Sequence, residues 1–385
     1  MTVWRTSQPG PGAVGADVRR EHPARSTLRV GIVGTGFMAR VHARAALVAG
    51  ATVAGVVGSA PERGPEAATT LGAEQGYPHL DAMLPDVDVV HVCSPNDAHA
   101  EATLRSLAAG RHVVCEKPLS TSSALAVEMW DAEQRSGRVG TVPFVYRFHP
   151  MVREARARVA EGALGRVGSL HGSYLQDWLS RGSDDNWRVD HTRGGPSRAF
   201  ADIGSHWCDL VEFVSGDRIA SLSARASTVQ PRRGGDDVRT EDVVTAQFVT
   251  AAGVLGTLVI SQVAAGRKNR LYLEVSGTDT TLTFDQETPE MLWVGRREGS
   301  QHLLRDPDHL AADAARLSRL PAGHAQGYQD CFDSFVADTY AAIAGEVNDG
   351  LPRFGDGVRS ALIVETAMSS AQAGGAWVDV PEVTR

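Results

Sequence analysis

A glycine-rich turn near the start of the chain constrains the fold more than any other feature. The short apolar run Leu28–Val33 ends at Gly34-Thr35-Gly36, and a helical pattern begins at once, with Ala39 completing a G-x-G-x-x-A motif. The first glycine permits a tight turn, the second lets the backbone approach a pyrophosphate, and the small third residue lets the helix pack on the strand. The amides at the helix N-terminus then face the phosphates. The motif therefore predicts a dinucleotide-binding strand, turn and helix.

Strand-like and helical segments alternate from residue 28 to residue 147. This alternation predicts a Rossmann-type α/β domain with a parallel, doubly wound sheet. Ligands of such sheets bind beyond the carboxyl ends of the strands, so the residues at those ends matter most. The expected strands are Leu28–Val33, Thr52–Val57, Val87–Cys93, His112–Cys115 and Val139–Val145, and the expected helices include Met38–Ala49 and Ala98–Ala108.

The pattern changes after Pro150, where most strand-like runs follow one another without helices between them. This predicts an α+β domain over residues 148–385, built on an open and mostly antiparallel sheet, with its last helices packing back on the first domain. Residues 1–27 lack apolar periodicity and are interpreted as a disordered extension. The expected strands are Val167–Tyr174, Ile219–Ala226, Val243–Val249, Val254–Gln262, Leu271–Gly277 and Thr280–Phe284, and the expected helices are Met151–Glu161, Tyr328–Ala344 and Gly357–Ala373.

Charge and composition exclude several classes of function. A net charge of -8 provides no basic surface for nucleic acid or an anionic membrane. No apolar run approaches the length of a membrane-spanning helix. The four cysteines lie far apart without a C-x-x-C pair, which predicts a reduced, cytoplasmic protein. The histidines lack the spacing of metal ligands, so no metal is expected.

The first candidate for chemistry is Lys117, in the segment Glu116-Lys117-Pro118 that follows the apolar strand His112–Cys115. A lysine at this strand end would be partly desolvated and close to the expected position of a nicotinamide. Burial disfavours the charged form, so the lysine could share a proton near neutral pH. The alternative is a surface lysine that merely ends a strand.

The second candidate is the pair Asp202 and His206, at the start of an apolar helical run. Residues four apart share one face of a helix. A carboxylate beside an imidazole raises its basicity and fixes its orientation, as a general base requires. The alternative is an N-cap aspartate with a core histidine.

The order of the motifs is more specific than any one of them. G-x-G-x-x-A is followed by S-P-N-x-x-H at Ser94–His99, then E-K-P, then D-x-G-x-H at Asp202–His206. In this order the chain resembles the Gfo/Idh/MocA family of sugar and cyclitol oxidoreductases from Leu28 to about Val380. The stretches Gly172–Trp178, Asn186–Arg188 and Gly266–Asn269 are similar to the levoglucosan dehydrogenase-like branch of that family.

The resemblance implies an NAD(P)-dependent dehydrogenase that transfers a hydride between the nicotinamide and a secondary alcohol of a sugar, glycoside, anhydrosugar or cyclitol. It implies Lys117, Asp202 and His206 as the catalytic group, and a homodimer or homotetramer formed through the sheet of the second domain. Two alternatives stay open: an NAD-dependent glycosidase that acts by transient oxidation, and a non-catalytic sensor that binds dinucleotide. Retention of all three catalytic residues argues against the sensor.

The end of the second strand bears on the choice of cofactor. An acidic residue there would bind the ribose 2′-hydroxyl of NAD, but Gly58-Ser59 provides none. Ser59 and Arg63 could instead hold a 2′-phosphate, which favours NADP, whereas levoglucosan-type relatives use NAD. The expected cofactor contacts are Gly34, Gly36, Phe37, Met38, Ser59, Arg63, Ser94, Pro95, Asn96, His99, Glu116 and Lys117. The expected substrate contacts are Arg147, Tyr174, Gln176, Trp187, Asp202 and His206, because their polar groups or aromatic rings suit a pyranose.

Overall fold

The computed structural model describes residues 27–383. The expected disordered extension, residues 1–27, lies outside the described residues except for Thr27. Among the described residues, no helix is both long and apolar enough to cross a membrane.

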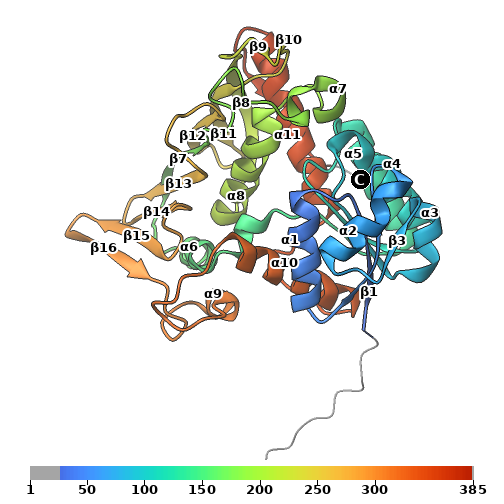
Figure 1. Cartoon of the computed structure of the whole chain (residues 1–385). Helices are drawn as coiled ribbons and strands as arrows, with labels where there is room; N and C mark the ends of the chain where they lie inside the picture. Colours follow the sequence, from blue (N-terminus) through green and yellow to red (C-terminus); the bar gives the residue numbers. More distant parts are fainter. Residues whose placement is uncertain (1–26, 384–385) are drawn as a thin grey trace, which may run out of the picture.

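The glycine turn belongs to a six-stranded parallel sheet with the order β3-β2-β1-β4-β5-β6 (Figure 1). The predicted doubly wound Rossmann sheet is thereby confirmed. Its strands are β1 (Arg29–Val33), β2 (Thr52–Val57), β3 (Gln75–Tyr77), β4 (Val89–Val92), β5 (His112–Cys115) and β6 (Gly140–Thr141). The helices of this region are α1 (Phe37–Val48), η1 (Pro61–Arg63), α2 (Gly64–Leu71), α3 (Leu80–Met83), η2 (Leu84–Asp86), η3 (Asn96–Ala98), α4 (His99–Ala108), α5 (Ser123–Ser136) and η4 (Val145–Phe148).

Two elements of this sheet differ from the prediction. The expected strand Val139–Val145 is only the two-residue β6, because Pro143 has no N–H for a ladder and the chain then turns into η4. Strand β3 was not predicted. It has three residues, of which one is buried, and so is too short to show a two-residue period.

The second sheet has nine strands in the order β16-β15-β14-β13-β7-β12-β11-β8-β17. All neighbours are antiparallel except β7 and β12, so the predicted open, mostly antiparallel sheet is confirmed. Strand β16 was missed because almost all of its residues are exposed and it shows no apolar face. The strands are β7 (Val167–Leu175), β8 (Ile219–Ser227), β11 (Val243–Thr250), β12 (Leu255–Ser261), β13 (Arg270–Gly277), β14 (Thr281–Asp285), β15 (Met291–Arg296), β16 (Gly299–Leu304) and β17 (Val378–Asp379), and a separate hairpin joins β9 (Arg232–Arg233) to β10 (Asp236–Asp237).

Helices cover one face of the nine-stranded sheet and separate it from the parallel sheet (Figure 1). Trp207 of α8 is fully buried there, and its Nε1 donates a hydrogen bond to the Tyr272 carbonyl oxygen at 2.8 Å. On the other face, alternate side chains such as Leu255 and Val259 are exposed. The helices are α6 (Pro150–Ala160), η5 (Trp187–Val189), α7 (His191–Gly194), η6 (Phe200–Gly204), α8 (Ser205–Ser215), α9 (Ala312–Leu317), α10 (Tyr328–Ile343) and α11 (Phe354–Gln372).

The last two long helices return to the parallel sheet. Helix α10 packs beside α1, and α11 packs against both α5 and β8 (Figure 1). Phe332 and Phe335 of α10 share one apolar core with Val41 and Ala45 of α1. The C-terminal part of the chain therefore completes the core of the N-terminal part.

Replacing Gly172 with alanine tests how closely α8 packs on the sheet. An added Cβ would overlap the Tyr272 carbonyl oxygen and lie 2.5 Å from Trp207 Nε1. We expect the free energy of unfolding, measured by urea denaturation, to fall by about 3 kcal/mol. The matched control is Gly168→Ala in the same strand, where the nearest atom would be 3.8 Å away. Equal stability of the two variants would contradict this packing.

Candidate active site

The glycine turn forms an open cradle at the start of α1. Gly34 has a φ of +115°, and a Cβ there would lie 2.6 Å from the Cys93 carbonyl oxygen, so only glycine fits. Over Gly36, an added Cβ would meet nothing within 4 Å, and no side chain caps the helix that follows. The Ser94 hydroxyl beside the turn is buried and has no partner among the described residues. Open space, uncapped amides and a free hydroxyl suit the pyrophosphate of a dinucleotide.

The S-P-N-x-x-H motif ties neighbouring segments together. The His99 ring lies between the Ser94 and Pro118 carbonyl oxygens, at 3.0 and 2.9 Å. Asn96, which follows Pro95 at the start of η3, donates a hydrogen bond from Nδ2 to the Gly194 carbonyl oxygen at 2.9 Å. The structure thus gives His99 and Asn96 positioning contacts to the E-K-P turn and to the insertion before Asp202.

The structure brings Lys117 and Asp202 together at the carboxyl end of β5. Lys117 Nζ lies 2.6 Å from Asp202 Oδ1 and donates to the Asp202 carbonyl oxygen at 2.9 Å. The second carboxylate oxygen accepts a hydrogen bond from Gln262 Nε2 at 2.8 Å, and Arg188 Nε lies 3.5 Å from Oδ1. Burial alone would raise the pKa of Asp202, but the two cations hold it below its ordinary value. The carboxylate is therefore ionised and fully bound.

His206 lies in the same buried region but makes no hydrogen bond from its ring to any described residue. The ring packs edge-on against Tyr146, with 4.9 Å between centroids. Its Nδ1 is buried without a partner. Burial, reinforced by the charge of Lys117 and only partly opposed by Asp202, places the pKa of His206 well below 6.5. The imidazole is therefore neutral at neutral pH and able to accept a proton.

The expected direct contact between Asp202 and His206 needs correction. Residues Phe200–Gly204 form a π-helix, η6, and the α-helix α8 begins only at Ser205. The wider turn rotates Asp202 out of the position that an i, i+4 partner has in an α-helix. The carboxylate consequently bonds Lys117 and Gln262, and it acts on His206 through charge alone.

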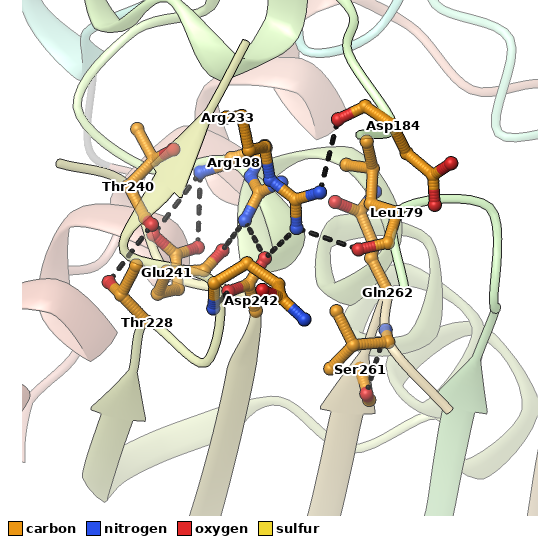
Figure 2. Close-up of polar contacts among 12 residues, drawn as sticks. Leu179, Asp184, Arg198, Thr228, Arg233, Thr240, Glu241, Asp242, Ser261 and Gln262 are labelled. Atoms are coloured by element: carbon orange, nitrogen blue, oxygen red, sulfur yellow. Dashed lines mark hydrogen bonds and ion pairs between the residues drawn. The ribbon is translucent and has the colours of Figure 1, made fainter. Parts of the chain in front are cut away.

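A buried ionic cluster around Asp242, drawn in Figure 2, lies next to the segments that carry Asp202 and Gln262. The guanidinium groups of Arg198 and Arg233 both bind the Asp242 carboxylate, and all three side chains are almost fully buried. Arg198 lies four residues before Asp202, and its carbonyl oxygen accepts a hydrogen bond from the Asp202 backbone N–H at 2.8 Å. The backbone N–H of Gln262 donates a hydrogen bond to the Asp242 carbonyl oxygen at 3.0 Å. The cluster therefore fixes both the helix that carries Asp202 and the strand end that carries Gln262.

A set of neutral polar groups lies beside His206. Asn269 Oδ1 accepts hydrogen bonds from the Tyr174 hydroxyl and from Gln176 Nε2, both at 2.7 Å, and its Nδ2 donates to the Tyr146 hydroxyl at 3.2 Å. The hydroxyls of Tyr146 and Tyr174 also contact each other. Burial raises the pKa of Tyr146 to about 12, so its hydroxyl keeps its proton. Amide and hydroxyl groups can each donate and accept hydrogen bonds, as binding of another hydroxyl group requires.

The remaining two expected substrate contacts have different environments. Trp187 is half-buried, and its ring stacks under the Arg188 guanidinium at 4.4 Å, so it lies close to Asp202. Arg147 is not brought to the catalytic group. Its guanidinium is bound instead to the Asp209 and Asp356 carboxylates.

The end of β2 has no acidic side chain within the segment 57–61. Ser59 and Arg63 are both exposed there. The Arg63 Cβ lies 3.0 Å from the position that a Cβ added to Gly58 would take. The Arg63 guanidinium makes no hydrogen bond or ion pair with a described residue. Phe37 and Met38 flank the cradle at the start of α1, with Phe37 63% exposed. In the region 27–383, no three histidine, cysteine or acidic side chains form a group that could hold a metal.

Sequence reasoning did not single out four polar residues of the site. They are Gln262, Asn269, Arg188 and Tyr146, which come from a strand end, a loop, η5 and η4. Asn269 and Arg188 lie inside stretches that carried the family resemblance, so that resemblance was the available signal. Nothing in the spacing of Tyr146 or Gln262 indicates a site, because only the pairing of distant segments places them there.

Comparisons with known proteins agree with this geometry. A family model described as "Oxidoreductase family, NAD-binding Rossmann fold" matches residues 28–144, and one described as "GFO/IDH/MocA C-terminal domain" matches residues 152–283. The chain is 32% identical to levoglucosan dehydrogenase of Pseudarthrobacter phenanthrenivorans, over 93% of this chain and 99% of that protein.

Solved structures give the same result. A levoglucosan dehydrogenase in complex with NADH and levoglucosan superposes with a TM-score of 0.87 at 29% identity, covering 93% of this chain and all of that chain. An inositol dehydrogenase homologue from Azotobacter vinelandii, in complex with NADH and myo-inositol, superposes with a TM-score of 0.81 at 27% identity, covering 92% of this chain and 97% of that one.

Proposed function

The chain belongs to the GFO/IDH/MocA oxidoreductase family, and on that premise we propose that it oxidises a secondary alcohol of a sugar, anhydrosugar, glycoside or cyclitol, or reduces the matching ketone. The observation that carries this proposal is the buried group of Lys117, Asp202 and His206 at a strand end of a dinucleotide-binding sheet. A nicotinamide dinucleotide, when bound, accepts or supplies the hydride. The cradle of Gly34, Gly36 and Ser94 would hold its phosphates.

His206 is assigned the role of general base. Its ring is neutral because burial and Lys117 lower its pKa. In alcohol oxidation a neutral imidazole takes the hydroxyl proton, and in ketone reduction the protonated ring returns it. Its buried position against Tyr146 fixes the direction of the ring.

Lys117 is assigned the stabilisation of charge on the substrate oxygen. Its ammonium is held by the Asp202 side chain and main chain, which leaves a third proton for a hydrogen bond to that oxygen. Such a preorganised donor stabilises the negative charge that develops on the oxygen. Asp202 keeps the ammonium in place, with Gln262 holding the other carboxylate oxygen.

Tyr174, Gln176, Asn269 and Trp187 are proposed as contacts to the sugar or cyclitol. The first three form one hydrogen-bonded set, and the fourth provides an aromatic ring for the apolar face of a pyranose. We further propose the boundary between the dinucleotide and substrate domains at residue 147, which the two family-model matches support. A second copy of the chain is proposed to cover the open face of the nine-stranded sheet.

Substitution of the catalytic residues tests the proposed function. We expect Lys117→Met and His206→Asn each to lower kcat by about 10²–10⁴-fold while the dissociation constant of the dinucleotide, measured by calorimetry, stays close to that of the wild type. Activity is followed by the absorbance of reduced nicotinamide over a panel of sugars and cyclitols. The control is His302→Asn on exposed strand β16. Rates near that of the wild type in both variants, or sugar release without net cofactor reduction, would contradict the proposal.

The pH dependence follows from the state of His206. Oxidation requires the neutral ring, and the neutral fraction rises with pH through a pKa that lies well below 6.5. We therefore expect kcat/KM for oxidation to show no imidazole inflection at or above pH 6.5. In Lys117→Met the ring loses a nearby cation, so its pKa, followed by NMR, should rise. An unchanged pKa in that variant would show that the two groups do not interact.

Cofactor preference is proposed to favour NADP, with Ser59 and Arg63 on the 2′-phosphate. Loss of one charge-assisted hydrogen bond costs about 1.5–3 kcal/mol, so Arg63→Ala should raise the KM for NADP by at least about tenfold and leave the KM for NAD unchanged. Ser59→Asp should shift the preference toward NAD. The matched control is Arg135→Ala, an exposed arginine of α5. Equal KM values of wild-type protein for both dinucleotides would overturn this assignment.

A further inference from the structure

A cavity of about 480 Å³ lies where α5, α6, α8 and α11 meet. None of Lys117, Asp202 and His206 lines it, so it is separate from the catalytic group. Its lining is rich in cations, although the chain as a whole carries a net charge of -8. The charged residues of the lining are Arg147, Arg156, Arg218, Arg359, Glu212 and Asp356, which are four cations and two carboxylates.

Two of the arginines form a fixed wall of the cavity. Arg359 is buried and donates hydrogen bonds to Glu212 Oε1 at 2.8 Å and to two backbone carbonyl oxygens. Arg147 is also buried, and its Nε and Nη2 donate to the Asp209 and Asp356 carboxylates, both at 2.8 Å. Arg147 Nη1 makes no hydrogen bond with a described residue, so the donors of this nitrogen are unused.

The Phe213 ring gathers further guanidinium groups beside this wall. The guanidinium carbons of Arg147, Arg153 and Arg156 lie 5.0, 4.9 and 4.4 Å from the ring centroid. Each cation is attracted to the aromatic face, but three cations around one ring repel one another. Burial, with a contribution from neighbouring cations, lowers the pKa of Arg153. Asp349 accepts a hydrogen bond from Arg156 Nη1 at 2.5 Å and offsets part of the repulsion, and a bound anion would offset more of it.

The cavity also presents unused arginine donors. Arg218, which follows α8, is exposed, and its side chain makes no hydrogen bond or ion pair with a described residue. Arg156 donates only from Nη1, so its Nε and Nη2 are unbonded within residues 27–383. Together with Arg147 Nη1, the unused N–H donors come from η4, α6 and the segment after α8. The three guanidinium groups therefore form a set of donors without an acceptor in the described part of the chain.

The number and origin of these donors indicate a phosphate. Arginine binds carboxylate and phosphate groups through two parallel N–H donors. A carboxylate has two oxygens in one plane, which a single guanidinium group can occupy. The oxygens of a tetrahedral phosphate point in several directions and can meet guanidinium groups from three segments. The cavity has the size of a small-molecule site, for which about 300–1,000 Å³ is typical, so it has room for a group attached to the phosphate.

We propose that this cavity binds a phosphate dianion through Arg147, Arg156 and Arg218, either as inorganic phosphate or as the phosphate group of a small ester. Both sources present the same dianion to the arginines. The proposal goes beyond the proposed function and does not depend on it, because the residues of the cradle, Gly34 and Gly36, do not line this cavity either. The site can therefore be filled while a dinucleotide is bound.

Titration of the full-length protein with inorganic phosphate and, separately, with phenyl phosphate tests the site. Excess oxidised dinucleotide is present throughout, so that neither probe occupies the pyrophosphate cradle. Binding is followed by calorimetry and by thermal unfolding, since a ligand of the folded protein raises Tm. The variants are Arg218→Ala, which removes the unbonded guanidinium group, and Arg218→Glu, which reverses its charge. The matched control is Arg239→Ala, because Arg239 is likewise exposed and unbonded among the described residues.

We expect Arg218→Ala to raise the Kd for inorganic phosphate by at least about tenfold, as loss of a hydrogen bond between charged groups does. Arg218→Glu should abolish binding, and Arg239→Ala should bind like the wild type. Without phosphate, the Arg218 variants should keep the Tm of the wild type, because this side chain has no bond to a described residue to lose. With phosphate, Tm should rise in the wild type and in Arg239→Ala only.

The two probes separate the sources of the anion. Binding of phenyl phosphate no tighter than that of inorganic phosphate identifies the free anion as the ligand, whereas tighter binding shows that the cavity also holds the attached group. Absence of binding by both probes, or equal Kd values in the wild type and Arg218→Ala, overturns the proposal. Absence of sugar oxidation would count against the proposed function alone, since no turnover enters this measurement.

Discussion

The ion pair between Lys117 and Asp202 is the contact on which the site depends. It joins the end of a strand in the parallel sheet to a π-helix that precedes α8, and both partners are largely buried. Breaking a buried pair of this kind by removing one partner costs about 3–5 kcal/mol, because the other charge is left without compensation. Here that cost is limited by Gln262 and Arg188, which also bind the carboxylate. The pair therefore links the parallel sheet to the helices of the second sheet. It also holds the Lys117 ammonium in place.

Charge near this junction is organised in two separate layers. In the inner layer, the Asp242 carboxylate binds two arginines. This layer fixes the backbone of the segments that carry Asp202 and Gln262. The outer layer contains Lys117 and a neutral His206. Because the Asp242 carboxylate binds these two arginines, it does not compete with Asp202 for Lys117. A base with a low pKa can consequently lie close to an ammonium group without losing its ability to take a proton from an alcohol.

Much of this arrangement could be predicted from local sequence. The glycine turn, the strands with clear alternation and the residue types Lys117, Asp202 and His206 follow from patterns within a few residues. The π-helix could not be predicted, since its wider turn is not visible in the spacing of apolar residues. Because of it, Asp202 bonds Lys117 and Gln262 and not the expected His206. Gln262 and Asn269 were missed because their roles arise from the pairing of β12 and β13 with β7. Arg147 was predicted as a substrate contact because its polar group suits a sugar, yet its side chain binds Asp209 of α8.

The return of α10 to α1 has a consequence for how the chain acquires its structure during synthesis. The core around Val41 and Ala45 is closed by Phe332 and Phe335, which are translated almost three hundred residues later. Until α10 emerges from the ribosome, one side of the Rossmann sheet exposes apolar surface that would otherwise be buried. Domains usually fold in order from the N-terminus as they are made. In this protein the core on one side of the first sheet is therefore closed only after α10 has been made.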